Sequence, residues 1–302
     1  MTGLSFTRRG KSARTSTKGR GLVLKELTLF GEIDKVAIAV KRLQSFEPSE
    51  GYYLAFSGGK DSIVIKKLAD LAGVKYDAHY NLTTVDPPEL VRYIKDIHPD
   101  VEISRPKLTL WQLIPKKKMP PTRVARYCCS ELKEGNGKGR IVVTGVRWAE
   151  SARRKANRNL VDIGGKTGVV LNDDNDEARR MVESCYRTQK TLVNPIIDWT
   201  DDEVWEFIRL YELPYCKLYD QGHKRLGCIG CPMTGEVGMK RDFERWPKYK
   251  KQYIRSFEKM LEARRAAGLV NKWQTGQDVF DWWIRDKHEK TPIEEIIEGE
   301  EK

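Results

Sequence analysis

The hydrophobic pattern of the chain changes abruptly at residue 57. An unbroken apolar run, Tyr52 to Phe56, is typical of a strand that is buried on both faces. From Ser62 to Ala72 the apolar residues recur instead at helical spacing. Two adjacent glycines, Gly58 and Gly59, lie between the two patterns. The pattern therefore predicts a buried strand, a glycine turn and a helix in direct succession.

Strand and helix patterns continue to alternate beyond this turn. Helices are predicted at 88–97 and, with Thr200 as N-cap, at 201–210, and further strands at 75–81, 101–104, 139–144 and 192–197. This alternation predicts an α/β fold, a parallel sheet covered on both faces with right-handed crossovers. In such sheets ligands bind at the carboxyl ends of the strands. Residues 57–62, Asp86 and Arg147 all follow strand ends, so we expect them on one binding rim.

The flanking regions divide the chain into three predicted parts. Residues 1–22 are basic, with Gly, Ser and Thr that cannot build a core, and predict a disordered tail. The central part, 23–242, is predicted to begin with an amphipathic helix over 24–46 and to carry an insertion at 155–190, with a hairpin around Gly164 and Gly165. The last part, 243–302, is a predicted helical extension with an aromatic stripe from Phe243 to Leu261 and an acidic tail.

Composition narrows the class of protein. The 302 residues include 55 basic and 43 acidic side chains, a formal net charge of +12 that favours anionic ligands or a nucleic acid, although solvated surface lysine gives the same balance. No run of 18 apolar residues is present, and the first 20 residues lack the apolar core of a secretory signal. Six cysteines without an export signal favour metal or redox chemistry over disulfides. We therefore expect a cytoplasmic protein without a membrane span.

The glycine turn has the composition of a phosphate-binding loop, Ser57-Gly58-Gly59-Lys60-Asp61-Ser62. Adjacent glycines let backbone N–H groups converge, and the helix that follows adds the positive end of its dipole. Lys60 can neutralise phosphate, Ser57 and Ser62 can donate hydrogen bonds, and Asp61 can orient a metal, a water or the loop. An ordinary tight turn is the alternative. The spacing is not that of a Walker A loop, and the sequence closely resembles the PP-loop of ATP pyrophosphatases, which cleave ATP between the α and β phosphates.

Four of the cysteines form two pairs. Cys128 and Cys129 are adjacent, and Cys228 and Cys231 form a C-x-x-C motif. Four thiolates can hold zinc or an iron–sulfur cluster. A vicinal pair is a poor substitute for a zinc knuckle, so this spacing favours a cluster, with zinc and unligated thiols as alternatives. Cys185 and Cys216 are interpreted as packed or incidental.

Together these motifs resemble the phosphoadenosine phosphosulfate reductase family over roughly Tyr52 to Pro232. The resemblance rests on the glycine loop and on four further segments, 84–89 (with an altered Asp-Thr-Gly order), 145–154, 195–205 and 218–228. It implies a PP-loop domain of the adenine-nucleotide α-hydrolase type, with Lys60, Asp61 and Arg147 catalytic. The implied nucleotide-binding set comprises Ser57, Gly58, Gly59, Lys60, Asp61, Ser62, Asp86, Gly145 and Arg147. In the cluster-containing branch the implied [4Fe-4S] ligands are Cys128, Cys129, Cys228 and Cys231.

One departure from the family affects the predicted reaction. Sulfonucleotide reductases end in a Glu-Cys-Gly type tail whose cysteine attacks sulfur, and this sequence has no cysteine after Cys231. The arrangement then resembles relatives in phage genomes and DNA phosphorothioation clusters. This resemblance implies an ATP pyrophosphatase that uses ATP, Mg²⁺ and a [4Fe-4S] cluster to activate an acceptor, including a nucleic acid, for sulfur insertion from a donor protein. The alternatives are a sulfonucleotide reductase with an external thiol and a nucleotide-binding protein without turnover.

Overall fold

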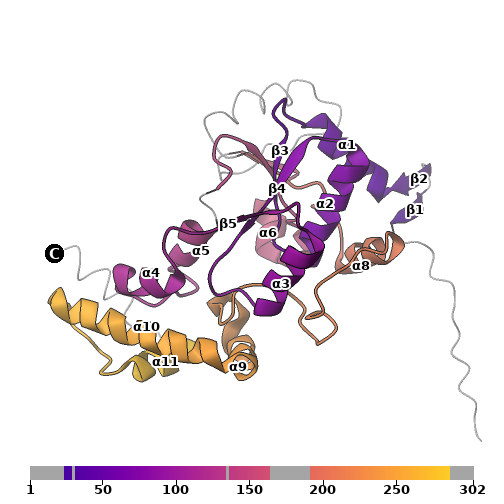
Figure 1. Ribbon diagram of the computed structural model, residues 1–302. Helices are drawn as coiled ribbons and strands as arrows, with labels where there is room; N and C mark the ends of the chain where they lie inside the picture. The colour runs from indigo at the N-terminus through magenta and orange to yellow at the C-terminus, as the bar shows by residue number, and fades with distance from the viewer. Residues whose placement is uncertain (1–23, 29–30, 134–135, 164–190, 286–302) are drawn as a thin grey trace, which may run out of the picture.

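The computed structural model describes residues 24–28, 31–133, 136–163 and 191–285 (Figure 1). Their centre is a six-stranded sheet in the order β5-β4-β3-β6-β8-β7. The strands are β3 (Tyr52–Ala55), β4 (Tyr76–Asn81), β5 (Glu102–Ser104), β6 (Ile141–Val143), β7 (Val161–Ile163) and β8 (Thr191–Val193). The first five strands in this order pair in parallel, which confirms the predicted α/β fold.

The edge strand β7 departs from the parallel pattern because it pairs antiparallel with β8. It belongs to the segment interpreted as an insertion, and Asn194 anchors it by donating from its side chain to the carbonyl oxygen of Asn159 (2.8 Å). The glycine pair at 164 and 165 and Cys185 lie outside the described residues. The sheet is therefore parallel except at this edge.

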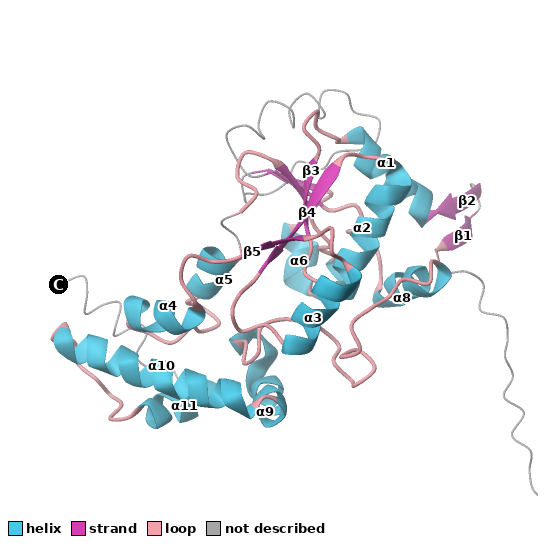
Figure 2. Ribbon diagram, in the orientation of Figure 1, coloured by secondary structure: helices cyan, strands magenta, loops and turns pink. Residues whose placement is uncertain are grey.

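The interior of the sheet is apolar because the central strands are buried on both faces. Leu54 of β3 lies opposite Ala78 on one side and Val143 on the other, and all three are buried. On one side, α1 (Lys35–Ser45) packs on α2 (Lys60–Ala72), which also contacts α8 (Asp201–Leu210) (Figure 2). The predicted cap of α8 is confirmed, since Thr200 Oγ1 accepts from the N–H of Glu203 (3.3 Å).

The predicted helix over 24–46 is wrong in its first half. Residues Lys25–Thr28 (β1) and Gly31–Asp34 (β2) pair as a separate antiparallel hairpin, and the helix begins only at Lys35. Asp34 sets this start because its Oδ1 accepts from the N–H groups of Val36 (2.9 Å) and Ala37 (3.0 Å). Helical spacing alone did not reveal this N-cap.

Helices far apart in the sequence pack together beyond the sheet. The predicted aromatic stripe is divided at Trp246 into α9 (Gly235–Arg245) and α10 (Pro247–Ala266), because proline starts the second helix. α10 packs on α11 (Gly276–Ile284) and on α4 (Leu110–Lys117), a helix that the sequence pattern did not predict. The other helices are α3 (Pro88–Ile97), α5 (Tyr127–Leu132), α6 (Ala152–Asn157) and the short η1 (Trp148–Glu150) and η2 (Pro232–Thr234). Within the described ranges, no helix has the length and apolar character needed to cross a membrane.

Candidate functional site

The glycine loop, residues 57–62, connects β3 to α2 in a conformation that its sequence requires. Gly58 has a φ of +70°, and a Cβ at this position would lie 2.7 Å from Leu90 Cδ1 and 2.8 Å from Ile94 Cδ1 of α3. Gly145 approaches the loop equally closely, because a Cβ there would lie 2.8 Å from the Cβ of Asp61. Glycine at both positions lets the carboxyl ends of β3 and β6 meet around α2.

Hydrogen bonds within the loop hold its shape. Ser62 Oγ donates to the carbonyl oxygen of Gly59 (2.8 Å), and Ser57 Oγ donates to Ser62 Oγ (3.3 Å). The N–H of Lys60 donates to the hydroxyl of Tyr219 (2.8 Å), which comes from a distant segment. The helix begins at Lys60, two residues before its predicted start, so the loop amides lie in its first turn.

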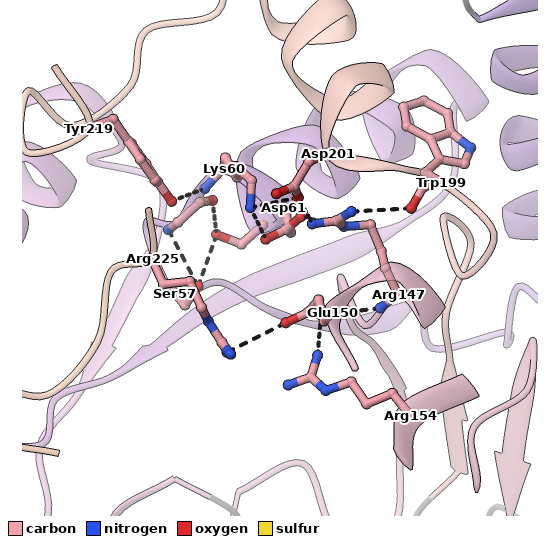
Figure 3. A network of polar contacts seen from close by, with 12 residues as sticks. Ser57, Lys60, Asp61, Arg147, Glu150, Arg154, Trp199, Asp201, Tyr219 and Arg225 are labelled. Carbon is pink, nitrogen blue, oxygen red and sulfur yellow. Dashed lines mark hydrogen bonds and ion pairs between the residues drawn. The ribbon is translucent and has the colours of Figure 1, made fainter. Parts of the chain in front are cut away.

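Two cations and two carboxylates form a paired network beside the loop (Figure 3). The Lys60 ammonium lies 3.4 Å from Asp61 and 3.3 Å from Asp201 at the start of α8. Arg147 donates through Nε to Asp61 (2.7 Å), through Nη2 to Asp201 (2.5 Å) and through Nη1 to the carbonyl oxygen of Trp199 (3.1 Å). Both cations are buried, with Lys60 4% and Arg147 1% exposed. This network fixes α2, β6 and α8 relative to one another.

The pKa values of this network reflect mutual pairing. Burial alone would raise the pKa of Asp201, but the hydrogen bond from Arg147 and the charge of Lys60 outweigh burial and lower it. Burial alone would lower the pKa of Arg147, but the carboxylates of Asp61 and Asp201 outweigh burial and raise it. Pairing therefore favours the charged forms of Asp201 and Arg147.

A cavity of about 180 Å³, the loop pocket, opens beside the loop. Ser57, Gly59, Lys60, Asp61, Ser62 and Gly145 line it, as the sequence predicted, together with Tyr219, Glu150, Arg154 and Arg225. Glu150 is an ion-pair partner of Arg154 and also lies 3.4 Å from Nη2 of Arg225. Arg225 was missed in the sequence because it lies in a segment without regular periodicity.

A second cavity of about 370 Å³, the cysteine cavity, is lined by all four predicted ligands, Cys128, Cys129, Cys228 and Cys231. Arg126 Nη2 lies 3.5 Å from Cys129 Sγ, and Cys228 Sγ lies 3.5 Å from Thr83 Oγ1. The hydrogen bond between the adjacent thiols and the interaction with Arg126 together lower the pKa of Cys129 to about 5. Burial acts in the opposite direction but is outweighed. That same hydrogen bond raises the pKa of Cys128, and burial raises that of Cys231.

Lys133 is a functional candidate that sequence reasoning missed. Lys133 lines the cysteine cavity, and its electrostatic interaction with Cys228 is the largest cause of its raised pKa. The sequence feature that could have revealed it is a basic residue one helical turn after the cysteine pair.

In the part of the chain that the structure describes, no three His, Cys, Asp or Glu side chains converge closely enough to hold a single metal ion.

The C-terminal helices fix both cysteine-bearing segments. Trp283 Nε1 donates to the carbonyl oxygen of Pro121 (2.5 Å), and Arg264 Nη1 donates to that of Lys118 (2.8 Å), both ahead of the adjacent pair. Tyr253 Oη donates to the carbonyl oxygen of Ile229 (3.0 Å), inside the C-x-x-C motif. α10 and α11 thus hold the two pairs at one cavity.

Residues 51–234, more than half of the chain, match the sequence profile of the phosphoadenosine phosphosulfate reductase domain. The chain belongs to this family. An adenosine 5′-phosphosulfate reductase of Shouchella clausii is 38% identical over 208 residues, which cover 64% of this chain and 75% of that protein.

Other relatives are more distant. An adenosine 5′-phosphosulfate reductase of Staphylococcus haemolyticus is 26% identical, and an uncharacterized protein of Methanocaldococcus jannaschii is 27% identical. These matches cover 55% and 66% of this chain but only 61% and 46% of the relatives, less than two thirds of their lengths. Among solved structures, phosphoadenylyl-sulfate reductase from Candida auris has a TM-score of 0.42 at 16% identity, over 63% of this chain and 87% of that chain.

In this member of the reductase family, three predicted site residues, Gly58, Asp86 and Arg147, do not line the loop pocket. The guanidinium of Arg147 pairs with Asp61 and Asp201, and its catalytic role stays a prediction. Asp86 is buried, accepts from the N–H of Thr83 (2.6 Å) and lines a different cavity of about 510 Å³ with Tyr249. The predicted single rim is therefore divided.

The loop pocket and the cysteine cavity meet at two residues. Arg225 and Leu226 line both, and they lie only a few residues before Cys228 in the chain. The two cavities therefore share part of their lining.

Proposed function

We propose that this protein is an ATP pyrophosphatase of the reductase family that adenylylates an anionic acceptor beside a [4Fe-4S] cluster, so that sulfur can replace the activated oxygen. The observation that carries this proposal is that Arg225 and Leu226 line both the loop pocket and the cavity that holds the four cysteines. Neither cavity alone would favour sulfur insertion.

The loop supports cleavage between the α and β phosphates. An acceptor oxygen would attack the α phosphorus, the bridging bond to the β phosphate would break, pyrophosphate would leave with the electron pair, and the acceptor proton would pass to solvent. The loop amides and Lys60 would stabilise the charge that grows on pyrophosphate. Mg²⁺, which prefers one or two carboxylates together with phosphate oxygens, would be held by Asp61, the carboxylate of the loop that lines the pocket, and would neutralise phosphate charge.

The cysteine cavity fits a cluster better than a single ion. Four thiols line one space of about 370 Å³, while no three ligands among the described residues meet at one point, as tetrahedral zinc requires. Cys128, Cys129, Cys228 and Cys231 would hold the cluster, and Lys133 and Arg126 would offset its negative charge. A cluster there would supply electrons or labile sulfide to the reaction.

The acceptor is proposed to be anionic because the cysteine cavity is basic. Arg126, Lys133, Arg225 and Arg241 line it with a single carboxylate, Asp242. Asp242 accepts from the N–H of Gly230 (3.0 Å), and burial raises its pKa. A phosphate-bearing acceptor such as a nucleic acid suits this surface and the net charge of +12.

Sulfonucleotide reduction with an external thiol is the second candidate. It is favoured by the 38% identical relative that is named an adenosine 5′-phosphosulfate reductase. In adenylyl sulfate the sulfate is bonded to the phosphate, so this substrate also carries two linked anionic groups and would bind in the same pocket.

The two candidates predict different products from one anaerobic, cluster-replete preparation. With α-labelled ATP, sulfide and either mixed-sequence DNA or total tRNA, we expect pyrophosphate from the adenylylation step and labelled AMP when sulfide displaces it from the acceptor. We expect little sulfite from adenylyl sulfate with thioredoxin. Lys60→Ala should suppress the ATP products. Thioredoxin-dependent sulfite release that also requires Lys60, without pyrophosphate release from ATP, would replace the first function with the second.

A further inference from the structure

The loop pocket has a second group of anion-binding side chains besides the glycine loop. At about 180 Å³ it is smaller than the roughly 300–1,000 Å³ of typical ligand sites, so it holds only the anionic part of a nucleotide. The ammonium of Lys60 already contacts two carboxylates. Figure 3 shows Arg154, Glu150 and Arg225 below this network, joined to it through the hydrogen bond from the N–H of Arg147 to Glu150 (3.2 Å).

Tyr219 lies between the loop and this second group. Its hydroxyl oxygen accepts from the N–H of Lys60 (2.8 Å), and its ring packs edge-on against Trp205 with ring centroids 5.1 Å apart. Within the described part of the chain the hydroxyl hydrogen has no acceptor, although Tyr219 lines the pocket. The hydroxyl can therefore accept from the helix and donate to a ligand at the same time.

Charge is unbalanced in the second group. Glu150 is the single carboxylate that pairs with both Arg154 and Arg225, so the three side chains carry a net positive charge. Burial lowers the pKa of Arg154, and repulsion from Arg225 and Arg158 acts in the same direction. An anion between the guanidinium groups would relieve this repulsion. Arg225 is well placed to adjust, because its side chain is 70% exposed.

We propose that Tyr219, Arg154 and Arg225 form a second anion subsite that binds the second of two linked anionic groups, while the loop amides bind the first. The ligand class is a diphosphate unit, either inorganic pyrophosphate or the β and γ phosphates of a nucleotide. The subsite makes the pocket select two linked anions over one. The proposal deepens the proposed function, since it rests on the loop being a phosphate site.

Titration calorimetry with inorganic pyrophosphate and with orthophosphate tests the subsite in the full-length anaerobic protein. Arg225→Gln should weaken pyrophosphate binding about tenfold or more, because it removes a charge-assisted contact. Tyr219→Phe should weaken it about fivefold, because one hydroxyl donor is lost. Neither change should weaken orthophosphate binding, which needs the loop alone. Lys224→Gln removes the same charge one residue away, at an exposed position that lines neither cavity, and should leave both affinities unchanged.

The outcomes separate the subsite from the proposed function. Equal weakening of both ligands by Arg225→Gln, or no weakening of pyrophosphate by either variant, would overturn the subsite and leave the loop as a phosphate site. Failure of the parent protein to bind pyrophosphate at all would overturn the subsite and the proposed function together. A thermal melt of each variant checks that folding is unchanged.

Discussion

The paired network beside the loop and the cysteine cavity have their charges balanced in different ways. Beside the loop, Lys60 and Arg147 face Asp61 and Asp201, so cations and carboxylates are equal in number and in contact. The cysteine cavity presents four cations and a single carboxylate. The first arrangement stabilises the fold by itself, whereas the second is suited to thiolates and to an incoming anion. Substitutions beside the loop should therefore affect stability as well as binding, and those around the cysteine cavity should chiefly affect what is bound.

The largest expected effect is at the cysteines. Anaerobically purified protein should be brown, with about four iron and four sulfide per chain, and Cys228→Ser should lose both the colour and the iron. Cys216→Ser is the matched control because Cys216 is buried away from the cavity lining, and it should keep the iron. Stoichiometric zinc in a colourless, folded preparation would rule out the cluster.

Lys60→Ala should weaken ATP binding and pyrophosphate release by about 100-fold, since one cation at the phosphate is lost. Equilibrium binding and a pyrophosphate assay measure the two quantities. Lys67→Ala, in the same helix but outside the pocket lining, should leave both unchanged. ATP binding at the parent level in Lys60→Ala would show that the loop is structural.

Arg147→Ala should act mainly on stability and so distinguish the two regions. It leaves Asp61 and Asp201 with Lys60 alone, and we expect a loss of about 2–3 kcal/mol in the free energy of unfolding, moderated because Asp201 is largely exposed. Denaturant unfolding at neutral pH measures this loss. Arg153→Ala, on the exposed side of α6, should change it little. A weakened affinity for pyrophosphate with parental stability would instead place Arg147 at the ligand.

The smallest expected effect concerns the loop backbone. Gly58→Ala should cost about 1–2 kcal/mol, because its positive φ is unfavourable for alanine and its Cβ would meet the flexible ends of Leu90 and Ile94. Gly73→Ala also has a positive φ but no atom within 4 Å of its Cβ, so it should cost less. Chemical denaturation of the Gly58→Ala and Gly73→Ala variants separates the contact with α3 from backbone strain. Equal losses of unfolding free energy in the two variants would show that backbone strain alone explains the need for glycine at residue 58.

The sequence predicted correctly those helices, strands and turns whose formation depends on neighbouring residues in the chain. The strand, glycine loop and helix at residues 52–72 were found because burial, φ and capping are encoded by adjacent residues, and Thr200 was found as a cap for the same reason. The hairpin at 25–34 was missed because its apolar residues also fit helical spacing.

The direction in which a side chain points at a strand end was less predictable. Arg147 follows β6 as expected, but the position of Asp201 in a distant helix decides that its guanidinium turns away from the pocket. Lys133 directly follows α5 and Arg225 lies outside any helix or strand, and only the assembled fold shows that both reach the cavities. The four cysteines were predicted to lie together, and they do line one cavity, whereas the cluster itself stays a prediction.

The bonds from α10 and α11 to the two cysteine segments have a consequence for biosynthesis. Pro121, Lys118 and Ile229 accept hydrogen bonds from Trp283, Arg264 and Tyr253, so the scaffold of both pairs lies downstream of every ligand. A nascent chain that has left the ribosome only as far as Cys231 already exposes all four thiols, but it still lacks α10 and α11, which hold the two cysteine pairs at one cavity. Loading of the proposed cluster should therefore follow the release of the C-terminal helices, and until then the thiols are open to oxidation.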